Sequence, residues 1–96
     1  MTTRQSILDT LHNAMPLLEK KYQIKTSALF GSYSRNEAVA ESDIDLMVDF
    51  SQSPGILFID LADELEHMLN QKVDIVSRNG IKPLYYAAIE QELIYV

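Results

Sequence analysis

Three aspartates and a glycine–serine turn are the residues of this chain whose types and spacing could do chemistry. The turn, Gly31-Ser32, follows an apolar run, and Asp43 and Asp45 open a second apolar stretch. Asp74 lies alone inside a third apolar run. A turn that can hold phosphate beside paired carboxylates, with a third carboxylate on another strand, is the minimum set for handling a nucleoside triphosphate with a divalent metal. The pattern therefore predicts nucleotidyl transfer.

The spacing of the first two aspartates matters because side chains of a β-strand alternate between its two faces. Asp43 and Asp45 project from the same face, roughly 6.6 Å apart at ~3.3 Å per residue. Rotation of the side chains can bring both carboxylates onto one ion, or onto two ions ~3.5–4 Å apart. Asp74 reaches the same place if its strand lies beside theirs. Asp49 shares their face but lies about 13 Å beyond Asp45, so we expect it to be solvated.

Repulsion between these carboxylates indicates that a cation belongs to the set. Two carboxylates ~4 Å apart repel by ~4 kcal/mol at an effective dielectric of ~20, and a small domain has only ~5–15 kcal/mol of stability in total. A divalent cation turns the repulsion into attraction, and ligands that are all oxygen favour Mg²⁺ or Mn²⁺ over zinc. The simpler alternatives are that Asp43 and Asp45 form a solvated strand edge or turn cap, and that Asp74 is the exposed half of an alternating strand.

The glycine–serine turn is a candidate phosphate site for separate reasons. Gly31 lets the backbone bend sharply and approach a ligand closely, and Ser32 then opens a helical turn whose free N–H groups attract phosphate. Arg35 falls on the same side of that turn and could pair with a β- or γ-phosphate oxygen. Ser42 could hydrogen-bond a phosphate or cap the loop before Asp43, and capping is the more usual role.

Size, composition and charge limit the possible functions. The 96 residues, 47% of them apolar, predict one domain over 1–96 with a single core. The chain has no apolar run of about 18 residues for a membrane span, no apolar signal region at its start and no cysteine, so we expect a cytoplasmic location. The net charge is −6 and the eight basic residues are scattered, which argues against binding of a long nucleic acid.

Hydrophobic periodicity predicts three longer helices. The first covers 3–22, with a cap from Thr3 or Ser6, and Pro16 should kink or split it. The second begins at Ser53-Pro54 and stops at Asn70, with core leucines at four-residue spacing from 57 to 69. The last runs from Pro83 to about Gln91, and a short helical turn is expected over 32–36.

Strands are expected between these helices. Their ranges are 24–30, 43–50 and 72–77, with a short closing strand over 93–96. In the second of them, Ile44, Leu46, Val48 and Phe50 share the face opposite the aspartates. This order of elements predicts a small α/β (α+β) fold, in which helices pack on a mixed or mostly antiparallel sheet.

Other conspicuous side chains receive structural assignments. His12 and His67 are expected on the surface, and Met47 and Met68 in the core. Tyr85-Tyr86 could stack a nucleobase, although packing is the commoner role of such a pair. The acids of the second long helix are expected to form its solvent face: Asp60, Asp63, Glu64 and Glu66.

Taken together, segments 29–35 and 42–48 and the isolated Asp74 resemble the minimal nucleotidyltransferase (MNT) family of the DNA polymerase β-like nucleotidyltransferase superfamily. The segments read Leu-Phe-Gly-Ser-Tyr-Ser-Arg and Ser-Asp-Ile-Asp-Leu-Met-Val, and the joint motif Gly-Ser…Ser-Asp-x-Asp-Leu is far more specific than its parts. The resemblance covers nearly the whole chain and implies the nucleotidyltransferase fold. Ser34 and Asn36 depart from the commonest pattern, but asparagine tolerates left-handed backbone, so the turn should survive.

The resemblance implies a role for each motif residue. The catalytic residues and ligands of Mg²⁺ or Mn²⁺ would be Asp43, Asp45 and Asp74, and Asp74 could also orient or deprotonate the acceptor hydroxyl. The nucleotide-binding residues would be Gly31, Ser32, Arg35 and Ser42. The reaction would be attack of a hydroxyl on the α-phosphorus of ATP, with pyrophosphate leaving.

The resemblance also implies a partner. MNT proteins look like the antitoxin half of HEPN/MNT toxin–antitoxin pairs, in which the enzyme places AMP on a tyrosine of a HEPN ribonuclease toxin. The expected partner is therefore a cognate HEPN-type toxin, with which the chain could form an oligomer. Two alternatives stay open. One is a non-catalytic antitoxin that neutralises its partner by binding, and the other is a nucleotidyltransferase for a small-molecule hydroxyl, which the lack of room for an acceptor domain disfavours.

Overall fold

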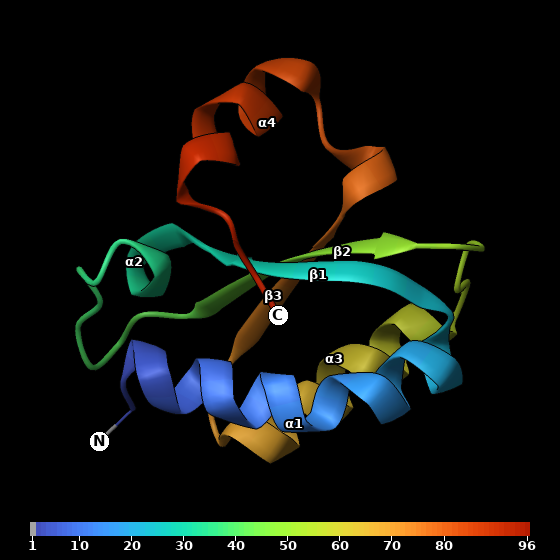
Figure 1. The fold of residues 1–96 in the computed structure, drawn as a ribbon, viewed down its shortest axis with the longest axis horizontal. Coiled ribbons are helices and arrows are strands. Elements are labelled where there is room, and N and C mark those ends of the chain that lie inside the picture. Colours follow the sequence, from blue (N-terminus) through green and yellow to red (C-terminus); the bar gives the residue numbers. More distant parts are fainter. Residues whose placement is uncertain (1) are drawn as a thin grey trace.

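Helices and strands alternate along the chain, and the computed structural model describes residues 2–96 (Figure 1). The helices are α1 (Arg4–Tyr22), α2 (Gly31–Ser34), α3 (Leu57–Leu69) and α4 (Pro83–Ile89), and the strands are β1 (Ile24–Phe30), β2 (Ile44–Phe50), β3 (Val73–Ser77) and β4 (Ile94–Tyr95). Two 3₁₀ turns, η1 (Arg78–Gly80) and η2 (Glu90–Glu92), flank α4. The predicted last helix is thus divided between α4 and η2, and the predicted α/β fold is confirmed.

The four strands form one mixed sheet in the order β3-β2-β1-β4. β1 runs antiparallel to both β2 and β4, whereas β2 and β3 are parallel. The parallel pair is possible because α3 carries the chain from the end of β2 back to the start of β3, which is the crossover that parallel neighbours require. β2 therefore lies inside the sheet, between β1 and β3.

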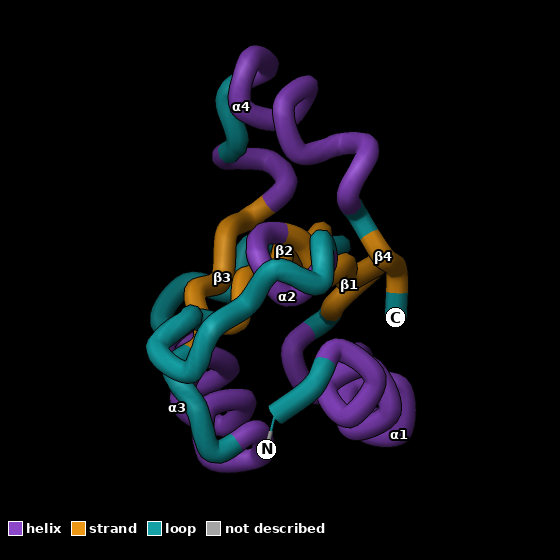
Figure 2. The backbone as a smooth tube through the Cα atoms, turned by 90° about the vertical axis from the view of Figure 1, so that its left-hand side faces the viewer, coloured by secondary structure: helices purple, strands orange, loops and turns teal. Residues whose placement is uncertain are grey.

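The two faces of the sheet have different cover (Figures 1 and 2). α1 and α3 pack on one face, and the α4 segment lies on the opposite side. The alternating residues of β2 from Ile44 to Phe50 enter the core beside α1 and α3, as predicted. Met47 points the other way, into a second apolar cluster with Ala28, Phe30 and Ile89. This smaller cluster holds α4 on the aspartate face and confirms Met47 as a core residue.

α1 begins at the predicted cap and continues past Pro16 without a break. Thr3 and Ser6 form a reciprocal capping box, in which each hydroxyl accepts from the other residue's backbone N–H at 3.0 Å. The expectation that Pro16 splits this helix is wrong. Pro16 and His12 both lie on the exposed face of α1, so water can replace the donor that the proline withholds from the His12 carbonyl. α1 is long, yet within residues 2–96 no helix is both long and apolar enough to cross a membrane.

α3 begins later than the sequence predicts. Its first residue is Leu57, it has no side-chain cap, and Ser53-Pro54 lies outside it. Gly55 has a φ of +59°, a left-handed conformation that interrupts a right-handed helix running on from Ser53-Pro54, so α3 starts after it. Asn70 ends the helix as predicted, with a φ of +53°.

The apolar stripe of α3 is narrower than predicted. Leu61 and Leu65 are buried in the core, at 0% and 1% exposure, but Leu57 is 43% exposed and Met68 is 38% exposed. The expectation that Met68 fills the core is therefore wrong. Met68 lies three residues after Leu65 and one before Leu69, on the edge of the stripe, where helix geometry turns it toward solvent.

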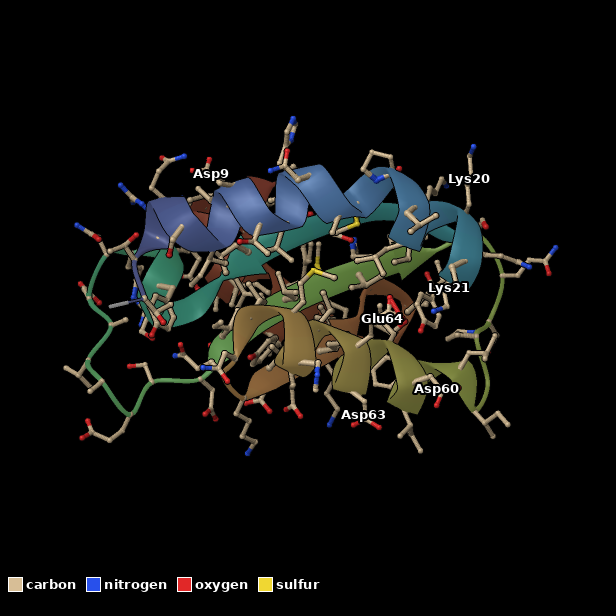
Figure 3. The ribbon with its side chains drawn as sticks, turned by 90° about the horizontal axis from the view of Figure 1, so that it is seen from below. Asp9, Lys20, Lys21, Asp60, Asp63 and Glu64 are labelled. Carbon is tan, nitrogen blue, oxygen red and sulfur yellow. The ribbon has the colours of Figure 1, made fainter. Side chains whose placement is uncertain are left out.

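Glu64 of α3 does not simply face solvent. Its Oε1 accepts hydrogen bonds from Lys21 Nζ at 2.7 Å and from the Tyr22 hydroxyl at 3.0 Å, and these contacts join α3 to α1 (Figure 3). The bond from Lys21, followed by the bond from Tyr22, lowers the pKa of Glu64 despite partial desolvation. The prediction of a purely solvated acidic face is therefore wrong at this position.

Glu66 also has a structural partner, because the α3–β3 connection is short. Its Oε2 accepts the backbone N–H of Val73 at 3.0 Å and thereby orients the first residue of β3. Asp60 and Asp63 are exposed, as predicted, and so is His67. The acidic cluster is thus divided into two solvated residues and two that hold elements in place.

Candidate active site

The register of two neighbouring strands brings the three predicted aspartates together. Asp45 of β2 pairs directly with Asp74 of the parallel strand β3. Asp43 precedes Asp45 by two residues and extends toward the same face, and its carboxylate lies 3.8 Å from Lys72 Nζ. Asp74 is exposed, and Asp43 and Asp45 are half-buried, so solutes can reach the group. The predicted proximity is present, while the metal-binding and catalytic roles of these residues remain predictions.

Packing on the opposite face of the sheet holds the carboxylates in this register. Ile44 and Leu46, on either side of Asp45, are both 0% exposed. Val73, which pairs with Ile44 across the two strands, is 4% exposed. A slip of one residue in the register would exchange these apolar side chains with the aspartates. Because the apolar side chains are buried against α1 and α3, the aspartates must face the other side of the sheet. Asp49 has the same orientation but is half-buried rather than solvated, because the α4 segment lies over that side of the sheet.

Gly31 sets the backbone of the turn directly against Asp45. Phe30 pairs with Asp45 across β1 and β2, so the turn that follows Phe30 lies at the same end of the sheet as the acids. Gly31 has a φ of +79°, and a β-carbon there would overlap the Asp45 carboxylate. A glycine is therefore required both for the left-handed backbone and for the close approach. Gly31 is the first residue of α2, and Ser32, the second, is half-buried.

Burial and like charge raise the pKa of Asp45. Desolvation is the largest cause, and the negative charges of Asp74 and then Asp43 add to it, while Arg35 opposes them. The negative charges of Asp74 and Asp43 thus act on the Asp45 carboxylate. Within residues 2–96 no three acidic, histidine or cysteine side chains are arranged so that they could hold a metal ion as a group. The donor set fits Mg²⁺ or Mn²⁺ in its chemistry, since it is all oxygen and its mutual repulsion calls for a cation.

Arg35, predicted from the sequence to pair with a phosphate oxygen, already has two acidic partners in the structure. Its Nε donates to Glu37 at 2.8 Å and its Nη1 donates to Glu92 at 2.7 Å, and the first of these bonds does most to raise its pKa. The Ser34 hydroxyl also donates to the backbone carbonyl of Glu92. Sequence reasoning missed Glu92 as a neighbour of the turn, because 57 residues separate it from Arg35 and no motif includes it. Asn36 keeps the turn, with a φ of +60°, as predicted.

Ser42 serves as a loop cap, the more usual of its two predicted roles. Its hydroxyl accepts the backbone N–H of Val39 at 2.9 Å, and its carbonyl accepts from Gln71 Nε2 at 2.8 Å. These bonds tie the loop that carries Asp43 to the start of β3. The hydroxyl hydrogen of Ser42 is still available to a ligand oxygen, so its predicted role toward a nucleotide stays a prediction.

The two adjacent tyrosines of α4 have different surroundings. The Tyr86 ring is covered by the Arg78 guanidinium, whose carbon is 3.8 Å from the ring centroid. The Tyr85 ring meets Phe30 edge-on, with centroids 6.5 Å apart and an interplanar angle of 89°, and Tyr85 is 50% exposed. Packing therefore accounts for Tyr86, while Tyr85 leaves part of its side chain open to solvent on the aspartate side of the sheet.

A mixed sheet that presents three aspartates on neighbouring strands, beside a glycine turn that contacts one of them, defines a nucleotidyltransferase. The chain belongs to that class by sequence as well: it is a member of the family described as "Polymerase beta, Nucleotidyltransferase", whose profile matches residues 12–96. The predicted superfamily and its fold are thereby confirmed.

Individual proteins similar to this chain agree with the MNT resemblance. Protein adenylyltransferase MntA of Thermococcus cleftensis is 34% identical over 97 aligned residues, which cover 100% of this chain and 98% of that protein. A solved structure described provisionally as a minimal nucleotidyltransferase matches with a TM-score of 0.82 at 31% identity, covering 97% of this chain and 95% of that one. A complex of tri-AMPylated Shewanella oneidensis HEPN toxin with MNT antitoxin matches in fold, with a TM-score of 0.61 at 22% identity, covering 96% and 66% of the two chains.

Proposed function

We propose that this chain is a metal-dependent protein adenylyltransferase that acts as an antitoxin, by transferring AMP from ATP to a tyrosine hydroxyl of a HEPN-type ribonuclease toxin in the cytoplasm. The observation that carries the proposal is the β2–β3 register, which sets Asp74 beside Asp45 on an open face next to Gly31. A relative 34% identical over its length is named a protein adenylyltransferase. The fold also occurs in a complex of an MNT antitoxin with an AMPylated HEPN toxin.

The carboxylates would hold the metal. Asp43, Asp45 and Asp74 would bind Mg²⁺ or Mn²⁺, which when bound would stabilise the entering and leaving oxygens of the transfer. The raised pKa of Asp45 supports this assignment, because a carboxylate held beside two others is poised to exchange repulsion for attraction to a cation. The exposure of Asp74 leaves one side of the group open to the acceptor.

The glycine turn and Arg35 would hold the pyrophosphate portion of ATP. Gly31 and Ser32 follow Phe30 at the end of the sheet where Asp45 lies, and their backbone N–H groups would donate to the phosphate oxygens. Glu37 and Glu92 hold two nitrogens of the Arg35 guanidinium and so fix its plane. Its third nitrogen, Nη2, has no partner within residues 2–96 and would donate to a phosphate oxygen.

The transfer exchanges one phosphorus–oxygen bond for another. The acceptor oxygen forms a bond to the α-phosphorus, and the bond from that phosphorus to the oxygen bridging to the β-phosphate breaks. The pyrophosphate leaves with the bonding electrons, toward Gly31 and Ser32. The acceptor hydroxyl loses its proton to Asp74, the exposed acid of the group.

Intact mass spectrometry of the toxin tests this proposal. Incubation of the purified protein with cognate toxin, ATP and MgCl₂ should increase the toxin mass by whole AMP units. Asp45→Asn and Asp74→Asn should abolish the increase, because each removes one oxygen ligand and one charge from the site. Asp49→Asn is the matched control, since Asp49 lies on the same strand and face with no aspartate paired to it in β3, and it should transfer AMP normally.

The same variants separate the alternatives. No mass increase with folded, metal-supplied protein and its cognate toxin would refute the proposal. Full neutralisation of the toxin by Asp45→Asn would assign the chain as an antitoxin that acts by binding alone. Transfer of AMP to a hydroxylated small molecule, with none to the toxin, would instead identify a small-molecule nucleotidyltransferase.

A further inference from the structure

An apolar hollow of about 460 Å³ lies beside the predicted site and has no role in the phosphate and metal chemistry above. Its lining comes from β3, η1 and the start of α4: Val76, Ser77, Gly80, Ile81, Lys82 and Tyr85. Its volume falls in the range of about 300–1,000 Å³ that small-ligand sites occupy. The combination of an apolar wall with a few polar groups is typical of such sites.

The strand register gives the position of this hollow relative to the acids. Val76 pairs with Met47, two residues beyond the pair of Asp74 and Asp45, and it shares their face of the sheet. At ~3.3 Å per residue, Val76 lies roughly 7 Å along the strand from Asp74. Gly31 lies in the other direction, because Phe30 pairs with Asp45 and the chain then continues toward Asp43. Along this face the order is therefore turn, aspartates, hollow.

A nucleoside triphosphate has its chemical groups in the same linear order. If its β- and γ-phosphates are held at Gly31 and Ser32, its α-phosphate meets the aspartates, and its sugar and base extend beyond them. The ribose spans the distance of roughly 7 Å between Asp74 and Val76, and the base then reaches the hollow.

The lining of the hollow suits a flat nitrogen heterocycle. Tyr85 is 50% exposed, and its ring makes a T-shaped contact with the Phe30 ring at an interplanar angle of 89°. Val76 and Ile81 offer apolar contact, and the Ser77 hydroxyl and the Lys82 ammonium can donate to ring nitrogens. A stacking surface with two donors within reach is what recognition of a base requires.

We infer that this hollow binds the adenine ring of ATP, with Tyr85 as the residue on which the base stacks. The inference rests on the proposed function, which sets the direction in which the triphosphate lies. The competing occupant is the acceptor side chain of the toxin, which approaches the α-phosphorus opposite to the pyrophosphate and so needs space beside the same aspartates. The base is favoured because residues of this chain alone supply both the stacking ring and the donors.

Calorimetric binding of two probes in the presence of MgCl₂ tests the inference. The first probe is an ATP analogue with a non-hydrolysable α,β bridge, and the second is inorganic tripolyphosphate, which has no base. Tyr85→Ala should weaken binding of the analogue by about 5- to 150-fold, the range that one stacked base supplies, and should leave tripolyphosphate binding unchanged. Tyr85→Phe should bind the analogue like the native protein.

Two further variants guard against indirect effects. Leu84→Ala changes the preceding residue of α4, which is 88% exposed and does not line the hollow, and it should bind both probes normally. Gly80→Leu adds bulk to the lining at a position where no atom lies within 4 Å of the added β-carbon. It should weaken binding of the analogue alone, without any loss of an aromatic contact in the protein.

The outcomes separate this inference from the proposed function. Equal weakening of both probes by Tyr85→Ala, or normal binding of the analogue by Tyr85→Ala and Gly80→Leu, would overturn the base site. If both variants bind the analogue normally but modify the toxin more slowly, the hollow would be assigned to the acceptor, and the adenylyltransferase proposal would remain intact. Selective loss of analogue binding, in a protein that transfers no AMP to its toxin, would instead support the base site and refute the proposed acceptor.

Discussion

Replacing Asp45 by asparagine should stabilise the metal-free protein while it abolishes AMP transfer. Asp45 is half-buried, its pKa is raised by desolvation and by the charges of Asp74 and Asp43, and its carboxylate makes no hydrogen bond with any group of residues 2–96. Asparagine keeps the shape of the side chain against Gly31 and removes the charge. The residue is thus expected to serve function at the expense of stability, as active-site residues commonly do.

The size of the effect follows from the strand geometry. Asp45 and Asp74 are paired on strands ~4.8 Å apart, where two unit charges repel by about 3 kcal/mol at an effective dielectric of ~20 and by about 1 kcal/mol in water. Exposure of Asp74 moves the pair toward the lower figure. Since ~1 kcal/mol shifts the Tm of a domain this small by ~4–8 °C, Asp45→Asn should raise the Tm by at least about 4 °C at neutral pH.

The pH dependence has a definite sign. Because the pKa of Asp45 is raised in the folded protein, the folded state holds this proton more tightly than the unfolded chain does. The contribution of Asp45 to stability is therefore fully present below its unfolded pKa of about 3.9 and is lost as the pH rises through the folded pKa. The advantage of Asp45→Asn should accordingly be small near pH 4 and grow toward pH 7.

Thermal unfolding followed by circular dichroism, in EDTA and then in MgCl₂, measures these effects. MgCl₂ should raise the Tm of the native protein, since a ligand that binds only the folded state stabilises it, and should raise that of Asp45→Asn much less. Asp49→Asn is the control on the same strand and face. A Tm for Asp45→Asn that is unchanged or lowered in EDTA at pH 7, or a gain equal to that of Asp49→Asn, would refute the reasoning.

Three more predictions concern the framework of the site. Gly31→Ala should destabilise the protein by about 2–4 kcal/mol in urea unfolding, because alanine is strained in the left-handed backbone and would overlap Asp45. The control Gly55→Ala has the same left-handed backbone, with a φ of +59° and no atom within 4 Å, and should cost only about 1 kcal/mol. Equal losses would show that the contact with Asp45 is unimportant. Leu65→Ala, at a site that is 1% exposed, should lower the free energy of unfolding by about 2–5 kcal/mol. The urea midpoint should fall while the affinity for nucleotide stays unchanged. A loss of nucleotide affinity without a loss of stability would contradict the assignment of Leu65 to the core. Glu64→Gln should lower the Tm slightly at pH 7. The difference should disappear at a pH below the folded pKa of Glu64, because its lowered pKa gives a stabilisation that is lost as the pH falls through that value. A difference that persists below that pKa would exclude the ionic contact as its cause.

Local sequence rules predicted the elements well and their ends less well. The capping box of Thr3 and Ser6 and the stop at Asn70 follow from side-chain chemistry within one helical turn. Pro16 was misjudged because the cost of a proline depends on whether the carbonyl it leaves unpaired faces core or solvent. The start of α3 was misjudged because the left-handed Gly55 lies just after a serine–proline pair that otherwise favours a helix.

The candidate site, too, was predictable in part from local sequence rules and in part only from the tertiary structure. Period-two alternation placed Asp43 and Asp45 on one face, and the isolated Asp74 could be recognised as a third member. Whether Asp74 met them depended on β3 pairing in parallel beside β2. That pairing is set by α3, whose buried Leu61 and Leu65 return the chain across the sheet, and no pattern within either strand specifies it.

The sequence by itself determined which groups were available for chemistry: three carboxylates, a glycine–serine turn and an arginine, at spacings that a strand and a tight bend convert into geometry. Only the tertiary structure decided which groups became neighbours. It set Asp74 against Asp45, held Arg35 with Glu92 from 57 residues away, and left Tyr85 half-exposed while Arg78 covered Tyr86. The physical reason is that backbone geometry acts over a few residues, whereas register, ion pairs and ring contacts between distant segments are selected by packing of the whole core.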